Sequence, residues 1–196
     1  DLVKHFSLER ISRTAAIFDI KKLQWMNGFY IRQLNPAELA ERALPCFEKQ
    51  LPPQVKRPLD VGYVSQVVAL QQERAKTLVE FPANSGFFFV DDVDYPVDLL
   101  LKGGMTRERA RELLSASAAR LDAVAPFDMA SLEPPLRSLA EEVSVKTGDL
   151  FGLLRIAVTG RTAAPPLFQT MAVVGRDKCL RRIRSAIDRL SGPATP

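Results

Sequence analysis

Apolar residues recur along most of this chain at the spacing of one face of an α-helix. Between residues 64 and 79 they stand at positions 64, 67, 68, 75, 78 and 79, which predicts one amphipathic helix over that range. The ranges 107–124 and 177–190 show the same period, and further helices are expected at 36–49, 136–145 and 166–174. The best strand candidate, 86–90, is short and leads into acidic residues. The chain is therefore predicted to be all-α.

Local signals mark where some of these helices begin and end. Thr106 is a suitable N-cap for the helix at 107–124, and Gly192 with Pro193 stops the last helix. The segment 85–96 combines a glycine, a proline and a cluster of aspartates. It predicts a boundary near residue 97. The expected architecture is two consecutive helical-bundle subdomains, 33–97 and 98–196, preceded by the end of a helical linker segment, 1–32.

Composition limits the possible functions without choosing one. The chain has 196 residues and is 46% hydrophobic, enough for one or two small cores. Its net charge of +4 and pI of about 9.2 permit nucleic-acid binding without demonstrating it. No apolar run approaches the ~20 residues of a membrane span, and the N-terminal sequence lacks the pattern of a signal peptide. The first residue is not Met, as expected of a sequence that begins inside a longer protein.

Side chains able to carry catalysis are scarce. His5 is the only histidine, so Ser-His or Cys-His chemistry would rest on one residue in a terminal segment. Cys46 and Cys179 lie far apart and in no metal-ligand spacing, which argues against a disulfide framework or a zinc site and fits a reducing compartment. The sequence contains no visible catalytic centre.

The segment 18–28 combines aromatic, basic and amide side chains and allows two interpretations. In the functional one, Lys22 and Trp25 face an RNA backbone as a cation and a flat platform. In the structural one, these side chains fill the interior and form a turn: Phe18, Leu23 and Met26 pack inward, Trp25 fills a domain junction, and Asn27-Gly28 makes the turn.

Several motifs carry a resemblance to a known family. The pattern F-D-x-x-K-L-x-W-x-N stands at 18–27, R-x-x-T-L-x-E-F at 74–81, L-R-I-A-V-T-G at 154–160 and P-P-L-F at 165–168. Together they resemble the C-terminal, anticodon-binding region of bacterial-type glutamyl-tRNA synthetases, which are class I aminoacyl-tRNA synthetases. The resemblance covers essentially the whole chain, although 98–147 matches mainly in helical pattern. It implies that 1–32 joins the catalytic half and contacts the tRNA stem.

The resemblance also implies a set of RNA-binding residues. Unpaired bases are usually stacked on flat side chains and hydrogen-bonded along their edges. Arg155 offers a planar guanidinium for this, Thr159-Gly160 lets the backbone approach a base, and Leu167 adds an apolar wall. Periodicity alone favours another account, in which Arg155 forms an internal ion pair and Thr159-Gly160 ends a helix. The implied anticodon contacts are Arg74, Arg155, Thr159, Gly160, Ala164, Pro165 and Leu167, and the implied contacts with the tRNA stem or backbone are Lys22, Trp25 and Asn27.

Arg74 is expected at the edge of the apolar face of the helix at 64–79, where an arginine usually extends into solvent. In the resembled family this position can read the third anticodon base, and an arginine is associated with enzymes that accept only glutamate tRNAs. Anticodons for glutamate and glutamine differ there by C versus G, whose edges offer different donors and acceptors. A donor-only guanidinium suits such a filter. The resemblance therefore implies a discriminating enzyme.

Basic residues gather on the last helix, at Lys178, Arg181, Arg182 and Arg184. Lys178, Arg182 and Arg189 are expected on the side opposite its apolar stripe. The ordinary interpretation of such a run is a solvated face, and phosphate contact is the alternative.

The implied function is a tRNA-binding module that selects tRNA-Glu and positions it for a distant active site. The family's two catalytic signatures do not occur in this sequence, so the chain alone is expected to be inactive and to need no cofactor, whereas the full-length enzyme would use ATP and Mg. The expected partners are tRNA-Glu and the missing catalytic domain, without a membrane, and a cytoplasmic monomer is expected. Two alternatives stay open: an all-helical protein-interaction scaffold without RNA binding, and an enzyme that depends on His5.

Overall fold

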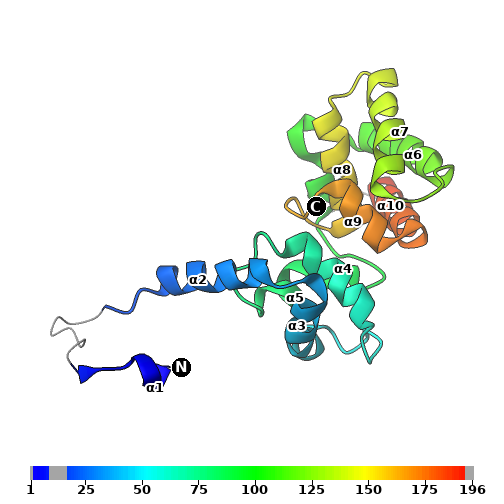
Figure 1. Ribbon diagram of the computed structural model, residues 1–196. Helices are drawn as coiled ribbons and strands as arrows, with labels where there is room; N and C mark the ends of the chain where they lie inside the picture. The colour runs from blue at the N-terminus through cyan, green and yellow to red at the C-terminus, as the bar shows by residue number, and fades with distance from the viewer. Residues whose placement is uncertain (1, 9–16, 193–196) are drawn as a thin grey trace.

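The computed structural model describes residues 2–8 and 17–192. Within these ranges the regular elements are helices and no strand occurs, which confirms the predicted all-α class. The single turn α1 (Leu2–His5) comes first, and α2 (Ile20–Gln33) then projects from the remaining helices as an arm (Figure 1). No helix among the described residues is both long enough and apolar enough to cross a membrane.

A first group of helices follows the arm. The helices α3 (Pro36–Gln50), α4 (Val61–Gln71) and α5 (Glu80–Ser85) pack against one another. Side-chain caps start two of them, because Asn35 accepts a hydrogen bond from the Glu38 amide at 3.0 Å and Asp60 accepts one from the Tyr63 amide at 2.8 Å. These caps fix where the chain turns into each helix. The short 3-10 turn η2 (Gly86–Phe88) closes the group.

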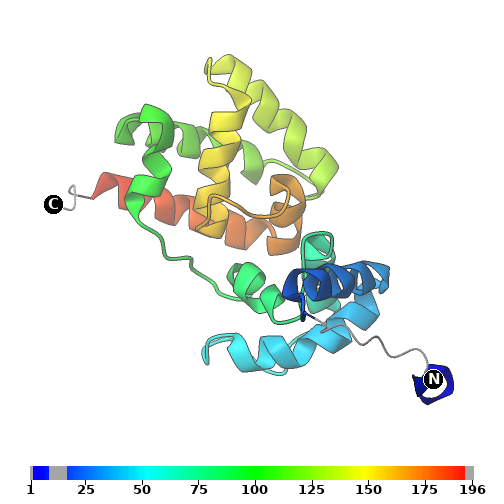
Figure 2. The same ribbon diagram turned by 90° about the vertical axis from the view of Figure 1, so that its left-hand side faces the viewer.

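A second group contains the rest of the described chain. Its elements are η3 (Val97–Gly104), α6 (Arg107–Asp122), α7 (Met129–Glu142), α8 (Thr147–Thr159), α9 (Leu167–Val174) and α10 (Arg176–Ser191). The last helix lies along α6, and α9 also packs against α4. The two groups therefore share one hydrophobic core that runs from Ile31 to Leu190. Figure 2 shows the segment between η2 and η3 crossing from one group to the other. The domain boundary near residue 97, at the end of this segment, stays a prediction.

The helix predicted over 64–79 is wrong beyond Gln71. The amides of Arg74 and Ala75 both donate back to the carbonyl of Gln71, at 3.0 and 3.1 Å. The side chain of Gln72 donates to the carbonyls of Ile31 and Leu34, at 2.9 and 2.7 Å. The helix therefore ends at Gln71 and continues as a turn, which the Gln72 side chain joins to the end of α2. Ala75 still reaches the core, being 5% exposed, so the apolar period continues although the helix does not.

Two further sequence interpretations are corrected. The strand candidate at 86–90 is wrong, because Phe87 and Phe88 are consecutive and both buried, with ring centroids 4.3 Å apart. Successive side chains of a strand would point to opposite faces. The helix expected from 136 begins at Met129, since Asp128 caps it by accepting from the Ser131 amide at 2.9 Å. By contrast, Thr106 caps α6 and α10 ends before Gly192, as predicted.

Candidate nucleic-acid interface

The loop between α8 and α9, taken as residues 160–167 so that it includes Leu167 at the start of α9, begins with a fixed backbone turn. Gly160 has a φ of 70°, and its amide donates to the carbonyl of Ile156 at 2.8 Å. The hydroxyl of Thr159 donates to the carbonyl of Arg155 at 2.7 Å and accepts from the amide of Arg161 at 3.2 Å. A Cβ on Gly160 would lie 3.3 Å from both Tyr95 and Val93. Only glycine satisfies both the left-handed conformation and the close approach.

Two hydrogen bonds join this loop to the first group of helices. Arg74 Nη1 donates to the carbonyl of Ala164 at 3.3 Å. Arg161 Nη2 donates to the carbonyl of Ala83 at 2.6 Å, with its guanidinium 5.9 Å from the ring centre of Phe87. Arg161 is absent from the set expected from sequence, although its place beside Gly160 was a usable signal. Arg74 itself lies in the turn after α4, not on a helix, and is exposed.

The other predicted residues of this region differ in exposure. Pro165 is buried and Leu167 is 4% exposed, so these side chains support the loop from the core side. Arg155 is half-buried, and its Nε is buried without a hydrogen-bond partner. Among the described residues no carboxylate pairs with Arg155, so the internal ion pair considered from periodicity is not formed. A buried donor without a partner is uncommon.

The arm α2 meets the first group near Arg74. Asn27 Nδ2 donates to the carbonyl of Lys76 at 2.5 Å. Gly28 is buried, and a Cβ there would lie 3.2 Å from the carbonyl oxygen of Ala75. The turn predicted at Asn27-Gly28 is therefore wrong, because both residues lie inside α2, where a small residue lets two backbones approach. Asn27 thus positions the arm against the turn that carries Arg74.

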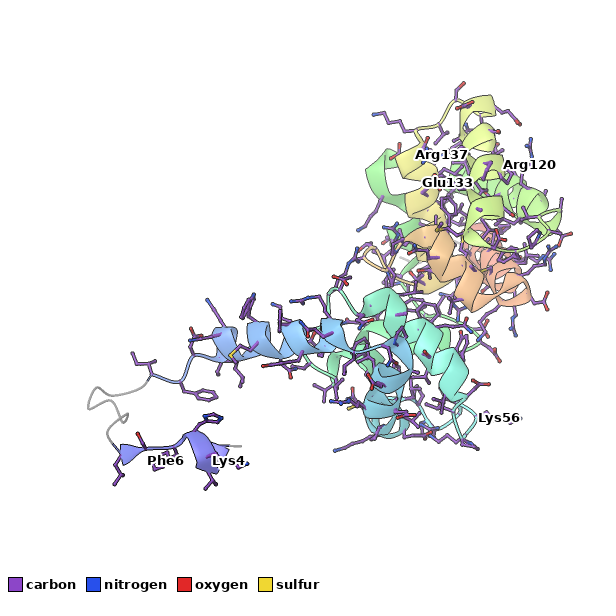
Figure 3. All side chains as sticks on the ribbon, viewed as in Figure 1. Lys4, Phe6, Lys56, Arg120, Glu133 and Arg137 are labelled. Atoms are coloured by element: carbon purple, nitrogen blue, oxygen red, sulfur yellow. The ribbon has the colours of Figure 1, made fainter. Side chains whose placement is uncertain are left out.

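Most of the remaining apolar residues of the arm are exposed, whereas Ile31 near its C-terminal end is buried. Trp25 is 65% exposed and stacks on Phe29, with ring centroids 6.1 Å apart. Lys22 is exposed as well. The inward packing expected for three side chains is wrong within the described chain, because Phe18, Leu23 and Met26 are 75%, 51% and 40% exposed. Figure 3 shows the side chains of α2 standing out from the arm.

The cations of α10 also depart from the expected solvated face. Arg182 is 1% exposed and donates to four backbone carbonyls. Lys178 Nζ donates to the carbonyl of Phe88 at 3.2 Å, and burial lowers the pKa of this amine, with the charge of Arg182 adding to the effect and Asp91 opposing it. Arg181 and Arg184 remain exposed. The prediction of a solvated face is therefore wrong for Arg182 and Lys178, because both side chains donate to backbone carbonyls.

Elsewhere, arginines pair with carboxylates in the ordinary way. Arg137 and Glu133, labelled in Figure 3, pair along α7 with Nε 2.6 Å from Oε1. Arg120 lies 2.5 Å from Glu142. The arginines at the interface donate to backbone carbonyls instead. No group of three or more metal-ligating side chains comes together in the ranges the structure describes.

Comparison with known proteins identifies the family of the chain. Residues 38–187 match the family model described as an anticodon binding domain, and the chain therefore belongs to that family. It is 48% identical over 190 residues to the glutamate–tRNA ligase of Dehalococcoides mccartyi strain CBDB1, covering 97% of this chain and 39% of that protein. It is 39% identical over 186 residues to the corresponding ligase of Moorella thermoacetica, covering 94% and 38%. The resemblance to the anticodon-binding region of glutamyl-tRNA synthetases is thereby confirmed.

A solved structure shares the fold. The chain matches a crystal structure of a glutamate tRNA ligase from Elizabethkingia meningosepticum in complex with its amino acid, with a TM-score of 0.77 and 22% identity, over 94% of this chain and 35% of that one. The chain spans about two fifths of the length of the curated relatives it matches. The activity of the whole ligases is a property of those proteins.

Proposed function

We propose that this chain is the module with which a glutamate–tRNA ligase holds the anticodon of tRNA-Glu. The observation that carries the proposal is the meeting of Arg74, from the first group of helices, with the 160–167 loop of the second group. Two residues that the resemblance assigns to the same anticodon thus lie in contact although they are 90 positions apart. Family membership over 38–187 and 48% identity to a glutamate–tRNA ligase support the same conclusion.

The geometry suits the recognition of unpaired bases. A guanidinium carries five N–H donors in a plane, and the Ala164 carbonyl takes one of those of Arg74. The bond is exposed and 3.3 Å long, so exchanging it for a base edge costs little. The buried Nε of Arg155 is a second donor for which a ligand oxygen or ring nitrogen would be the partner. The fixed turn at Thr159-Gly160 keeps the loop backbone in place while a base approaches.

The arm supplies the contact with the rest of the ligase. Most of its apolar side chains are exposed in this chain, including Ile20, Trp25 and Tyr30 at 59%, 65% and 63%. Exposed apolar area of this kind marks an interaction site, and about three fifths of the length of the relatives lies outside the match, which covers 39% of them. We assign this face to the missing catalytic half and Lys22 to the tRNA backbone. A cytoplasmic monomer fits both assignments.

Arg74 makes the module a filter for the third anticodon base. Along the Watson–Crick edge an unpaired cytosine offers two adjacent acceptors, N3 and O2, where a guanine offers two donors, N1–H and the N2 amino group. The donor-only guanidinium of Arg74 should therefore favour tRNA-Glu over tRNA-Gln. The test is the affinity of the chain for unmodified transcripts of both tRNAs at two salt concentrations, with and without Arg74→Gln. A matched control, Arg111→Gln, removes one exposed charge from α6.

The expected result is that tRNA-Glu binds better and that Arg74→Gln narrows the difference about tenfold, whereas the control leaves it unchanged. Affinity should fall steeply with salt for all variants. Equal binding of both tRNAs would contradict discrimination at the third anticodon base, and the chain would then be a general tRNA-binding module. If neither tRNA bound at low salt, a protein-interaction scaffold would be the better account.

A further inference from the structure

One face of α10 holds the two groups of helices together through backbone carbonyls. Lys178, Arg182 and Arg189, here called the carbonyl clamp, stand on this face at intervals of four and seven residues. Apart from Val158 in α8, their acceptors lie in η2 and in the segment that crosses to η3: the carbonyls of Phe87, Phe88, Val90, Asp91, Val93 and Tyr95. Asp91 and Asp94 add only exposed ion pairs, at 3.4 to 3.9 Å, which contribute little.

Arg182 is the centre of the clamp. Its Nη2 donates to Phe87 and Val90 at 2.6 and 2.7 Å, its Nε donates to Asp91 at 3.0 Å, and its Nη1 donates to Val158 at 2.5 Å, all at carbonyl oxygens. No carboxylate is among these partners. A buried cation is tolerated when its donors are satisfied, and the negative ends of helices favour a positive charge.

Two of the four acceptors of Arg182 lie at the ends of helices. Val158 lies in the last turn of α8, where carbonyls lack partners within the helix. Phe87 lies in η2. The next residues after Val158 are Thr159 and Gly160, which begin the loop of the proposed anticodon site. One guanidinium therefore joins the root of that loop, from the second group, to a turn of the first group.

Arg189 continues the same connection. It donates to the carbonyls of Val93 and Tyr95 at 3.1 and 3.3 Å, and its guanidinium lies 5.0 Å from the ring centre of Tyr95. The Cα of Gly160 faces these same two residues, because a Cβ there would lie 3.3 Å from each. The loop thus rests on a segment whose position Arg189 holds.

We propose that Arg182 is a positioning residue for anticodon recognition, which with Arg189 sets the place of the 160–167 loop relative to Arg74. The inference rests on the proposed function, because it assumes that Arg74 and the loop read one RNA together. Arg182 does not touch the RNA. It acts by fixing the position of Val158 relative to the 87–91 segment, so that Arg74 and Ala164 face the same base.

The test uses the whole chain and the variants Arg182→Lys and Arg189→Gln. A lysine keeps the charge but cannot reach four carbonyls in a plane. The matched controls are Arg181→Lys and Arg184→Gln, which change exposed cations on the same helix. For each variant the affinity for tRNA-Glu is compared with that for the same transcript carrying a substituted anticodon, at a temperature where circular dichroism shows the variant folded.

The expected result is a selective loss. Arg182→Lys should lower the ratio of the two affinities about tenfold and Arg189→Gln about threefold. Each lost hydrogen bond from a guanidinium loosens the position of the loop relative to Arg74. Affinity for the substituted transcript and its salt dependence should stay as in the parent chain, since no phosphate contact is removed. A role in stability alone would lower the melting temperature and leave the ratio unchanged.

Opposite outcomes separate the two proposals. If the parent chain discriminates and both folded variants discriminate equally well, the positioning role is wrong and the proposed function stands. If the parent chain does not discriminate, the proposed function fails and the inference falls with it. If Arg182→Lys does not fold, Arg189→Gln decides the question. Arg189 is partly exposed, and its acceptors, Val93 and Tyr95, lie beside Gly160 of the loop.

Discussion

Arg74 and Ala164 are joined by a hydrogen bond from Nη1 to the carbonyl oxygen, 3.3 Å long, across 90 residues of sequence. Arg74 lies in the turn after α4, and Ala164 lies in the loop between α8 and α9. One exposed bond of this length adds little to stability. Its importance is geometric, because it places a donor-rich side chain of the first group beside the loop of the second.

The first prediction concerns the close approach at Gly160. Gly160→Ala should lower the free energy of unfolding by about 2–3 kcal/mol, because the methyl group meets Tyr95 and Val93 at 3.3 Å and the φ of 70° disfavours a side chain. Gly103→Ala is the control, since Gly103 has a φ of 73° but nothing within 4 Å of the added atom. Its cost should be about 1 kcal/mol. Urea unfolding measures both, and equal costs would show that the contact with Tyr95 is unimportant.

The second prediction concerns the exposed arm. Trp25 is the only tryptophan and is 65% exposed, so its fluorescence should be red-shifted and easily quenched by iodide in this chain. In a longer protein that includes the catalytic half, the emission should shift to the blue and the quenching should fall, because the apolar face of α2 becomes covered. Unchanged emission in the longer protein would contradict the assignment of the apolar face of α2 to the catalytic half.

The third prediction concerns alkaline stability. Burial raises the pKa of the Tyr63 phenol to about 12, while the charge of Arg182 partly opposes the shift. The folded state therefore keeps a proton that the unfolded chain loses above about pH 10. The stability due to neutral Tyr63 is fully present below that pH and is lost as the pH rises to about 12. Burial raises the pKa of Cys179 to about 12 as well. Its thiol therefore also makes the free energy of unfolding fall as the pH rises.

Tyr63→Phe isolates the contribution of the phenol. The variant should lose about 1 kcal/mol at neutral pH, because the hydroxyl donates to the carbonyl of Phe88 at 3.1 Å. Its stability should then fall less steeply than that of the parent between pH 10 and 12. Tyr30→Phe, which removes the hydroxyl of a tyrosine that is 63% exposed on the arm, is the control. Equally steep slopes for the parent and Tyr63→Phe would contradict the assignment.

The sequence predicted most of the helices because their apolar period is the consequence of a buried face. It failed where the same period continued through a turn. The chain leaves the helix after Gln71, and the side chains of Gln71 and Gln72 donate to carbonyls of Asn84, Ile31 and Leu34. Such contacts join residues far apart in sequence, so no local pattern contains them. The start of α7 was hidden by Pro134 and Pro135, which the helix accommodates after the Asp128 cap.

The site was less accessible from sequence than the fold. The motifs pointed to Arg74 and to Ala164, but only the structure shows that they touch. The motifs pointed equally to Asn27, but its side-chain amide donates to the carbonyl of Lys76. The burial of Arg182 was not predicted, because a cation expected on the side opposite an apolar stripe is usually solvated, and its four acceptors are backbone atoms without a sequence signature.

The most direct measurement asks which part of a tRNA this chain holds. The affinities of the chain for two short RNAs would be compared by fluorescence anisotropy: the isolated anticodon stem-loop of tRNA-Glu and a minihelix of its acceptor arm. The account predicts that the stem-loop binds, that it competes with the whole tRNA, and that changing its third anticodon base weakens binding about tenfold. Stronger binding of the acceptor minihelix, or no effect of the anticodon sequence on the affinity of the stem-loop, would contradict it.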